Sequence, residues 1–131
     1  MTQRLNGSAA LAGALILIVE DDFLISLELQ SILSDAGAQV VGPTRSVEGG
    51  LALVSDKLSA AILDLRLGKT AVTPVAQRLA ASGIPFLFYT GQTRDDPTLS
   101  DWPAAVVIAK PALPRILVSE LSKLLTSRVA A

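Results

Sequence analysis

Residues 14–22, ALILIVEDD, place six consecutive apolar residues directly before three consecutive carboxylates. An apolar run of this length, bounded by charge, is typical of a strand that is covered on both faces in a parallel sheet. Its carboxyl end would present Glu20, Asp21 and Asp22 at the edge of the sheet. Ligands of open α/β sheets bind beyond the carboxyl ends of the strands, so a functional site is expected at this edge.

Strand-like and helix-like patterns alternate along the rest of the chain. Further strands are expected over residues 38–42, 59–63, 84–89 and 104–109, and helices over residues 23–36, 46–55, 73–82 and 114–127. Residues 91–103 contain two prolines and leave room only for a helix of one or two turns near 97–102. This order predicts an α/β fold with a doubly wound five-stranded parallel sheet, helices on both faces, and a fourth helix that is short or absent.

Single residues suggest where these elements begin and end. Gly37 is expected to stop the first helix, and Pro43 to end the second strand. Ser46 is a candidate cap for a second helix, which the Gly49-Gly50 pair should weaken. Thr73 is a candidate cap, followed by proline at the first helical position, and should open the third helix. Residues 1–13 are expected to form a flexible N-terminal tail, and residues 14–127 the domain.

Composition narrows the chemistry open to this chain. It has no cysteine and no histidine, which excludes disulfides, thiolate catalysis and a serine–histidine triad. Its 11 Lys and Arg residues balance 12 Asp and Glu residues without a basic cluster, so we expect no direct binding to nucleic acid. The uncharged residues 5–19 resemble a signal peptide, but their small-residue cleavage sites come before the most apolar part of the run, whereas cleavage should follow it. The run is also too short to span a membrane. We expect no membrane insertion.

Polar side chains follow four of the expected strands: Glu20 and Asp21 the first, Asp64 the third, Thr90 the fourth and Lys110 the fifth. Clustered carboxylates repel one another and need a cation, and an all-oxygen ligand set favours Mg²⁺. Beside this ion, a carboxylate can accept a phosphoryl group whose oxygens are neutralised by the metal, an ammonium and a hydroxyl. The residue types at this edge therefore suit phosphoryl transfer.

Four motifs together closely resemble the CheY-like receiver domain of two-component response regulators. They are residues 18–22 (IVEDD), 64–68 (DLRLG), 88–91 (FYTG) and 110–111 (KP). The resemblance implies a flavodoxin-like strand order of 2-1-3-4-5, a cis Lys-Pro bond, and Asp64 as the phosphoacceptor. It further implies that Asp21 binds Mg²⁺ directly and Glu20 through water. The Arg66 carbonyl would be another ligand of Mg²⁺, and Thr90 and Lys110 would contact the phosphoryl group.

Residues 85–91, PFLFYTG, resemble a narrower group, the FAT GUY receivers, whose motif is Pro-Phe-x-Phe-Ala-Thr-Gly. Tyr89 replaces the alanine of that motif, and Val107 stands where ordinary receivers carry a switch aromatic. The resemblance implies a cytoplasmic, stand-alone receiver that catalyses only its own phosphorylation and dephosphorylation. Its partners would be a histidine kinase, of the HWE type in this group, or a histidine phosphotransfer protein, and a downstream protein target.

Several alternatives remain open at this stage. The chain could be a phosphate sink or an unphosphorylated pseudo-receiver. A haloacid-dehalogenase-type phosphotransferase also uses a strand-end Asp with Mg²⁺, but it needs a second Asp at position 66, where this chain has Arg66. The Arg66 side chain is expected to be exposed or to lie over the phosphoryl group. Asp22 is expected to cap a helix at the rim, and Trp102 to pack.

Overall fold

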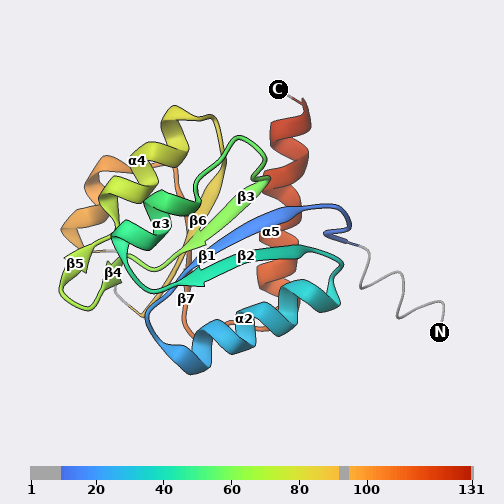
Figure 1. Cartoon of the computed structure of the whole chain (residues 1–131), viewed down its shortest axis with the longest axis horizontal. Coiled ribbons are helices and arrows are strands. Elements are labelled where there is room, and N and C mark those ends of the chain that lie inside the picture. Colours follow the sequence, from blue (N-terminus) through green and yellow to red (C-terminus); the bar gives the residue numbers. More distant parts are fainter. Residues whose placement is uncertain (1–9, 92–94, 131) are drawn as a thin grey trace.

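The computed structural model describes residues 10–91 and 95–130. Its central sheet has five parallel strands: β1 (Leu15–Val19), β2 (Gln39–Thr44), β3 (Ala60–Leu63), β6 (Phe86–Thr90) and β7 (Val106–Ala109). Their spatial order, β2-β1-β3-β6-β7, confirms the predicted 2-1-3-4-5 arrangement. The sheet runs through the middle of the molecule (Figure 1).

Helices cover both faces of this sheet, as predicted. The helices α2 (Phe23–Asp35) and α5 (Pro114–Ala130) lie on one face, and α3 (Val47–Leu53) and α4 (Thr73–Ala81) on the other (Figure 1). Alternate residues of β1 point into two separate cores: Ile16 and Ile18 face α2 and α5, while Leu17 and Val19 face the α3 and α4 side. All four side chains are fully buried, which explains the unbroken apolar run.

Among the described residues of the connection between β6 and β7, the structure has one short 3-10 helix, η1 (Pro97–Asp101). This confirms the expected short element in place of a full fourth helix. Residues 92–94 lie outside the described part of the chain. Among the described residues, no helix has both the length and the apolar character needed to cross a membrane.

One element was not predicted from the sequence. After Asp64 the chain forms a small antiparallel hairpin from β4 (Arg66–Leu67) and β5 (Thr70–Ala71). Gly68 begins its two-residue turn with a φ of 65°, a conformation that glycine adopts without steric cost. Leu65 and Leu67 are buried and anchor the hairpin to the core on the α3 and α4 side.

Three local predictions were wrong. Pro43 does not end the second strand, because β2 is an edge strand and its register with β1 shifts between Leu17 and Val19, where a residue without an N–H is tolerated. Thr73 does not cap α4; the buried Val72 precedes the helix, and its carbonyl accepts from the N–H of Val75. Leu11, assigned to the flexible tail, is buried, so the packed part of the chain begins before residue 14.

The Gly49-Gly50 pair has a packing role that the sequence did not reveal. A Cβ atom on Gly50 would lie 2.9 Å from Val75 Cγ2 of α4 and 3.4 Å from Val19 Cγ2 of β1. The absence of a side chain therefore lets α3 approach the sheet and α4 closely. Ser46 caps α3 as predicted, because its hydroxyl accepts from the N–H of Gly49 at 3.0 Å.

Candidate functional site

The carboxyl ends of β1 and β3 bring three carboxylates together. Glu20 and Asp64 are buried and Asp21 is half-buried, and one oxygen from each lies within 4.8 Å of the others. Backbone pairing fixes this arrangement: the N–H of Asp64 donates to Val19 O at 3.0 Å, and that of Glu20 donates to Thr44 O at 2.9 Å. The sequence correctly placed all three residues at one edge of the sheet.

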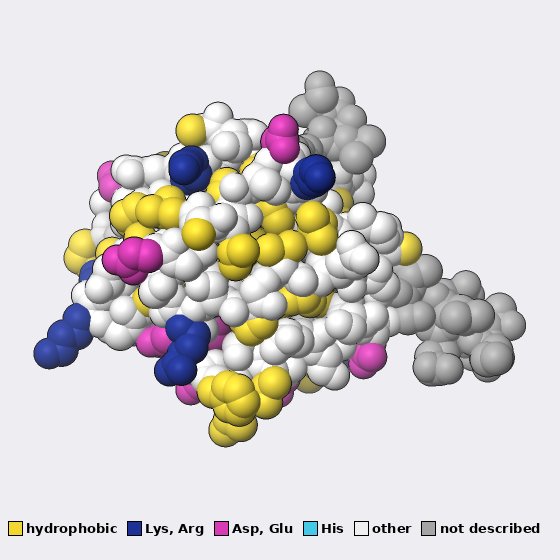
Figure 2. Space-filling view, viewed as in Figure 1, with side chains coloured by type: hydrophobic (Ala, Val, Ile, Leu, Met, Phe, Trp, Pro, Cys, Tyr) yellow, Lys and Arg dark blue, Asp and Glu magenta, His cyan; other side chains and the backbone are white. Residues whose placement is uncertain are grey.

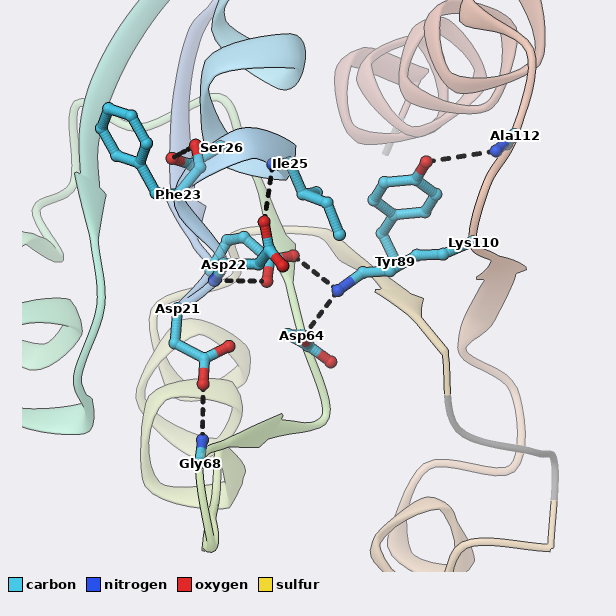
Figure 3. Close-up of polar contacts among 11 residues, drawn as sticks. Asp21, Asp22, Phe23, Ile25, Ser26, Asp64, Gly68, Tyr89, Lys110 and Ala112 are labelled. Atoms are coloured by element: carbon cyan, nitrogen blue, oxygen red, sulfur yellow. Dashed lines mark hydrogen bonds and ion pairs between the residues drawn. The ribbon is translucent and has the colours of Figure 1, made fainter.

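Lys110, at the end of β7, reaches into this cluster. Its Nζ donates to Asp64 Oδ2 and to Glu20 Oε1, both at 2.8 Å, and only 14% of its side chain is exposed (Figure 3). Burial by itself would lower the pKa of Lys110, but its hydrogen bonds with Asp64 and Glu20 raise it overall. The ammonium is therefore charged and links two carboxylates that would otherwise repel each other.

Burial and the nearby charge of Asp64 raise the pKa of Glu20, although its hydrogen bonds with Lys110 and with the N–H of Asp22 oppose this shift. Three carboxylates against one ammonium leave an excess of negative charge at the site. The donors are all oxygens, and the part of the chain described here offers neither histidine nor cysteine beside them. This donor set fits a hard divalent cation such as Mg²⁺. The role of the Arg66 carbonyl as a further ligand stays a prediction.

Two neighbouring contacts hold the acidic turn in place. Asp21 Oδ2 accepts from the N–H of Gly68 at 2.7 Å, which ties the turn after β1 to the hairpin after Asp64 (Figure 3). Asp22 caps α2, because its Oδ1 accepts from the N–H of Ile25 at 3.0 Å. Asp22 is thus a rim residue that starts a helix, as predicted, whereas the link to Gly68 could not be foreseen without the hairpin.

The Arg66 side chain is 35% exposed and pairs with Asp96, a contact that the prediction for this side chain did not include. Its Nε donates to Asp96 Oδ2 at 3.1 Å and its Nη2 to Asp96 Oδ1 at 3.2 Å. Nη2 also donates to the Thr98 hydroxyl at 3.4 Å. The guanidinium therefore joins the hairpin after Asp64 to the start of η1. This partner was hidden because Asp96 lies thirty positions further along the chain.

Thr90 and Trp102 complete the predicted set. Thr90 ends β6 and is fully buried, and its carbonyl accepts from the N–H of Lys110 at 3.0 Å. Trp102 packs edge-to-face against Phe86, with ring centroids 5.3 Å apart, in agreement with a packing role. The Lys110–Pro111 peptide bond is cis, as the family resemblance implies.

Known structures share this fold, and one of the proteins, solved in two forms, is also similar in sequence. SdrG from Sphingomonas melonis Fr1 is 41% identical, with a TM-score of 0.75 over 88% of this chain and 98% of SdrG. A BeF3-activated conformation of SdrG is 40% identical, with a TM-score of 0.70 over 87% of this chain and 98% of that chain. A CheY-like response regulator receiver domain protein from Methanospirillum hungatei JF-1 is 24% identical, with a TM-score of 0.79 over 89% and 97%. No protein-family model and no curated protein matches the chain.

The sheet order and the strand-end cluster define an α/β fold of the CheY type. Because the chain is also 41% identical to SdrG over 98% of the length of SdrG, it belongs to the CheY-like receiver domains of response regulators.

Proposed function

We propose that this chain is a receiver that takes a phosphoryl group from a phosphohistidine onto Asp64, with Mg²⁺, and thereby changes its partner-binding surface. The observation that carries the proposal is the contact of one ammonium, Lys110 Nζ, with both Asp64 and Glu20 inside a cluster of three carboxylates. A lysine held between a nucleophile and a metal-ligand carboxylate is placed to contact an incoming phosphoryl oxygen.

In the proposed reaction, a carboxylate oxygen of Asp64 attacks phosphorus, the O–P bond forms, and the N–P bond to the donor imidazole breaks. Only 10% of the Asp64 side chain is exposed, so most of the acceptor carboxylate is shielded from solvent. Lys110 exchanges one carboxylate contact for a phosphoryl oxygen, and the Thr90 hydroxyl would bind a second one. Glu20, Asp21 and Asp64 would hold Mg²⁺, which supplies charge neutralisation at the phosphoryl oxygens when bound.

The surface beside the site supports docking of a protein phosphodonor. Phe23, Leu24 and Leu27, at the start of α2, are 64%, 74% and 46% exposed. Figure 2 shows hydrophobic side chains projecting from this edge of the molecule. The helix follows directly after Glu20, Asp21 and Asp22, so a donor that reaches Asp64 would cover these apolar side chains. We propose a histidine kinase of the HWE type, or a histidine phosphotransfer protein, as this donor.

Within the receiver domains, we propose that the chain belongs to the FAT GUY group, because residues 85–91 resemble the motif of that group. Members of that group typically act as stand-alone cytoplasmic receivers, and we propose the same here. The protein would not be an enzyme on other substrates. It would catalyse only the making and breaking of its own aspartyl phosphate, and would pass the signal to a downstream protein.

The test is phosphotransfer from a panel of histidine kinases encoded in the same genome, followed on the wild type and on Asp64→Asn. Rapid transfer from one kinase to the wild type and none to Asp64→Asn supports the proposal. A binding partner whose affinity changes on phosphorylation separates an output receiver from a phosphate sink. Tight partner binding without transfer from any kinase would instead identify a pseudo-receiver.

A further inference from the structure

Tyr89 is the single tyrosine of the chain and lies one residue before Thr90 on β6. It is 2% exposed and packs in the core beneath α2 and α5. A phenol in an apolar core needs a hydrogen-bond partner for its hydroxyl, whereas phenylalanine would fill the same space without this requirement. The hydroxyl has such a partner: it accepts from the N–H of Ala112 at 3.1 Å.

This hydrogen bond and a backbone hydrogen bond hold the chain at Lys110 and two residues after it. On one side, the N–H of Lys110 donates to the carbonyl of Thr90, the residue next to Tyr89. On the other side, the chain is tied back to Tyr89 two residues later, at Ala112. The Lys110 ammonium also lies over the Tyr89 ring, 5.8 Å from its centroid, within the range of a cation–π contact (Figure 3).

Lysine carries its charge on a flexible four-carbon stem, so its position depends on what surrounds it. In this structure the ammonium has two carboxylate partners, Glu20 and Asp64. If a cation engages Glu20, one of these partners is lost. The ring of Tyr89 and the anchored segment after Pro111 do not depend on that carboxylate and would still restrict the lysine.

We propose that Tyr89 is a positioning residue that keeps Lys110 directed at Asp64, through its ring beneath the ammonium and its hydroxyl bond to Ala112. The inference deepens the proposed function and rests on Asp64 being the phosphoacceptor. It assigns a role in the site to a side chain that belongs to the hydrophobic core.

The test compares Tyr89→Phe with the wild type in the rate at which acetyl phosphate and Mg²⁺ phosphorylate Asp64, measured by intact mass. We expect a decrease of about fivefold, the factor that corresponds to one lost hydrogen bond of ordinary strength. In the Lys110→Ala background the same substitution should have no further effect, because Tyr89 acts through Lys110. A merely structural role would produce the same factor in both backgrounds.

A matched control is Phe88→Leu, on the opposite face of β6 in the other core. It should lower the melting temperature without this dependence on Lys110. NMR of the Lys110 ammonium in the unphosphorylated protein gives an independent reading: its ¹⁵N signal should shift or broaden in Tyr89→Phe, more so in Tyr89→Met, and not in Phe88→Leu.

The possible results separate the positioning role of Tyr89 from the proposed function. An unchanged rate in Tyr89→Phe, or an equal decrease in the Lys110→Ala background, overturns the positioning role. If the wild type itself is not labelled at Asp64, the proposed function fails. The ¹⁵N signal of the Lys110 ammonium then still tests whether Tyr89 positions Lys110. An unchanged signal in both Tyr89 variants would overturn the inference.

Discussion

The bridge between Arg66 and Asp96 allows a prediction whose size follows from the contacts. The Asp96 side chain is 5% exposed, and its carboxylate accepts two hydrogen bonds from the Arg66 guanidinium and one from the N–H of Thr98 at 2.8 Å. In Asp96→Asn, a neutral amide can still accept from Thr98 but loses the two-point pairing with the guanidinium. The link between the hairpin after Asp64 and η1 would then be weakened.

A hydrogen bond to a charged group contributes about 1.5–3 kcal/mol to stability. The Arg66 side chain is 35% exposed, so solvent screening places the loss near the lower limit, at about 1.5 kcal/mol. Unfolding entropy scales with chain length, and for a chain of 131 residues this loss corresponds to a decrease of about 5 °C in melting temperature.

The stability that the Asp96 carboxylate contributes should also depend on pH. Hydrogen bonding by Arg66 is the main reason that the pKa of Asp96 lies below its ordinary value of 3.8. A carboxylate with a lowered pKa in the folded state stabilises the protein fully above 3.8, and this stabilisation is lost as the pH falls through the folded-state value. The difference between wild type and Asp96→Asn should therefore be largest near neutral pH and shrink in acid.

The assay is thermal unfolding followed by circular dichroism, with Asp101→Asn as control. Asp101 is exposed and is the last residue of the 3-10 helix that Asp96 caps, so its substitution should change stability by less than about 0.5 kcal/mol. If Asp96→Asn melts at the same temperature as Asp101→Asn at neutral pH, the bridge contributes nothing and the reasoning is refuted. A difference that persists unchanged in acid would show that its cause is not the carboxylate charge.

Two further predictions concern the site and its response. Mg²⁺ at a hundredfold excess over its dissociation constant should stabilise the wild type by about 2.7 kcal/mol, and Glu20→Gln should respond much less; equal melting curves with and without Mg²⁺ would argue against the metal site. Beryllofluoride, as a phosphoryl mimic, should shift amide NMR signals most strongly within residues 95–102, because Val107 cannot act as a switch aromatic and Arg66 links this segment to the acceptor loop. Changes confined to residues 46–55 would contradict this route.

The sequence predicted the sheet because its central strands are apolar on both faces. Ile16, Leu17, Ile18 and Val19 alternate between two cores, and no other element type accommodates such a short, fully buried run as simply. The positions of the carboxylates followed from the same logic, since parallel strands end at one edge. For this reason the sequence alone was enough to predict that Glu20, Asp21 and Asp64, which follow the ends of two strands, lie close together.

What the sequence did not reveal depends on long-range partners. Arg66 looked like an exposed side chain because Asp96, its partner, is remote in sequence. Pro43 looked like a strand terminator because edge position and register are properties of the assembled sheet. Leu11 resembled part of a tail because its contact with the end of α2, through its N–H bond to Ala36 O, requires the packed helix.

The central claim is that Asp64 accepts a phosphoryl group with the help of Mg²⁺. Intact-mass measurement after incubation with acetyl phosphate tests it most directly. We predict that one phosphoryl group is added to the wild type with Mg²⁺, none to Asp64→Asn, and none to the wild type in excess EDTA. Undiminished labelling of Asp64→Asn, or labelling that survives EDTA, would contradict the claim.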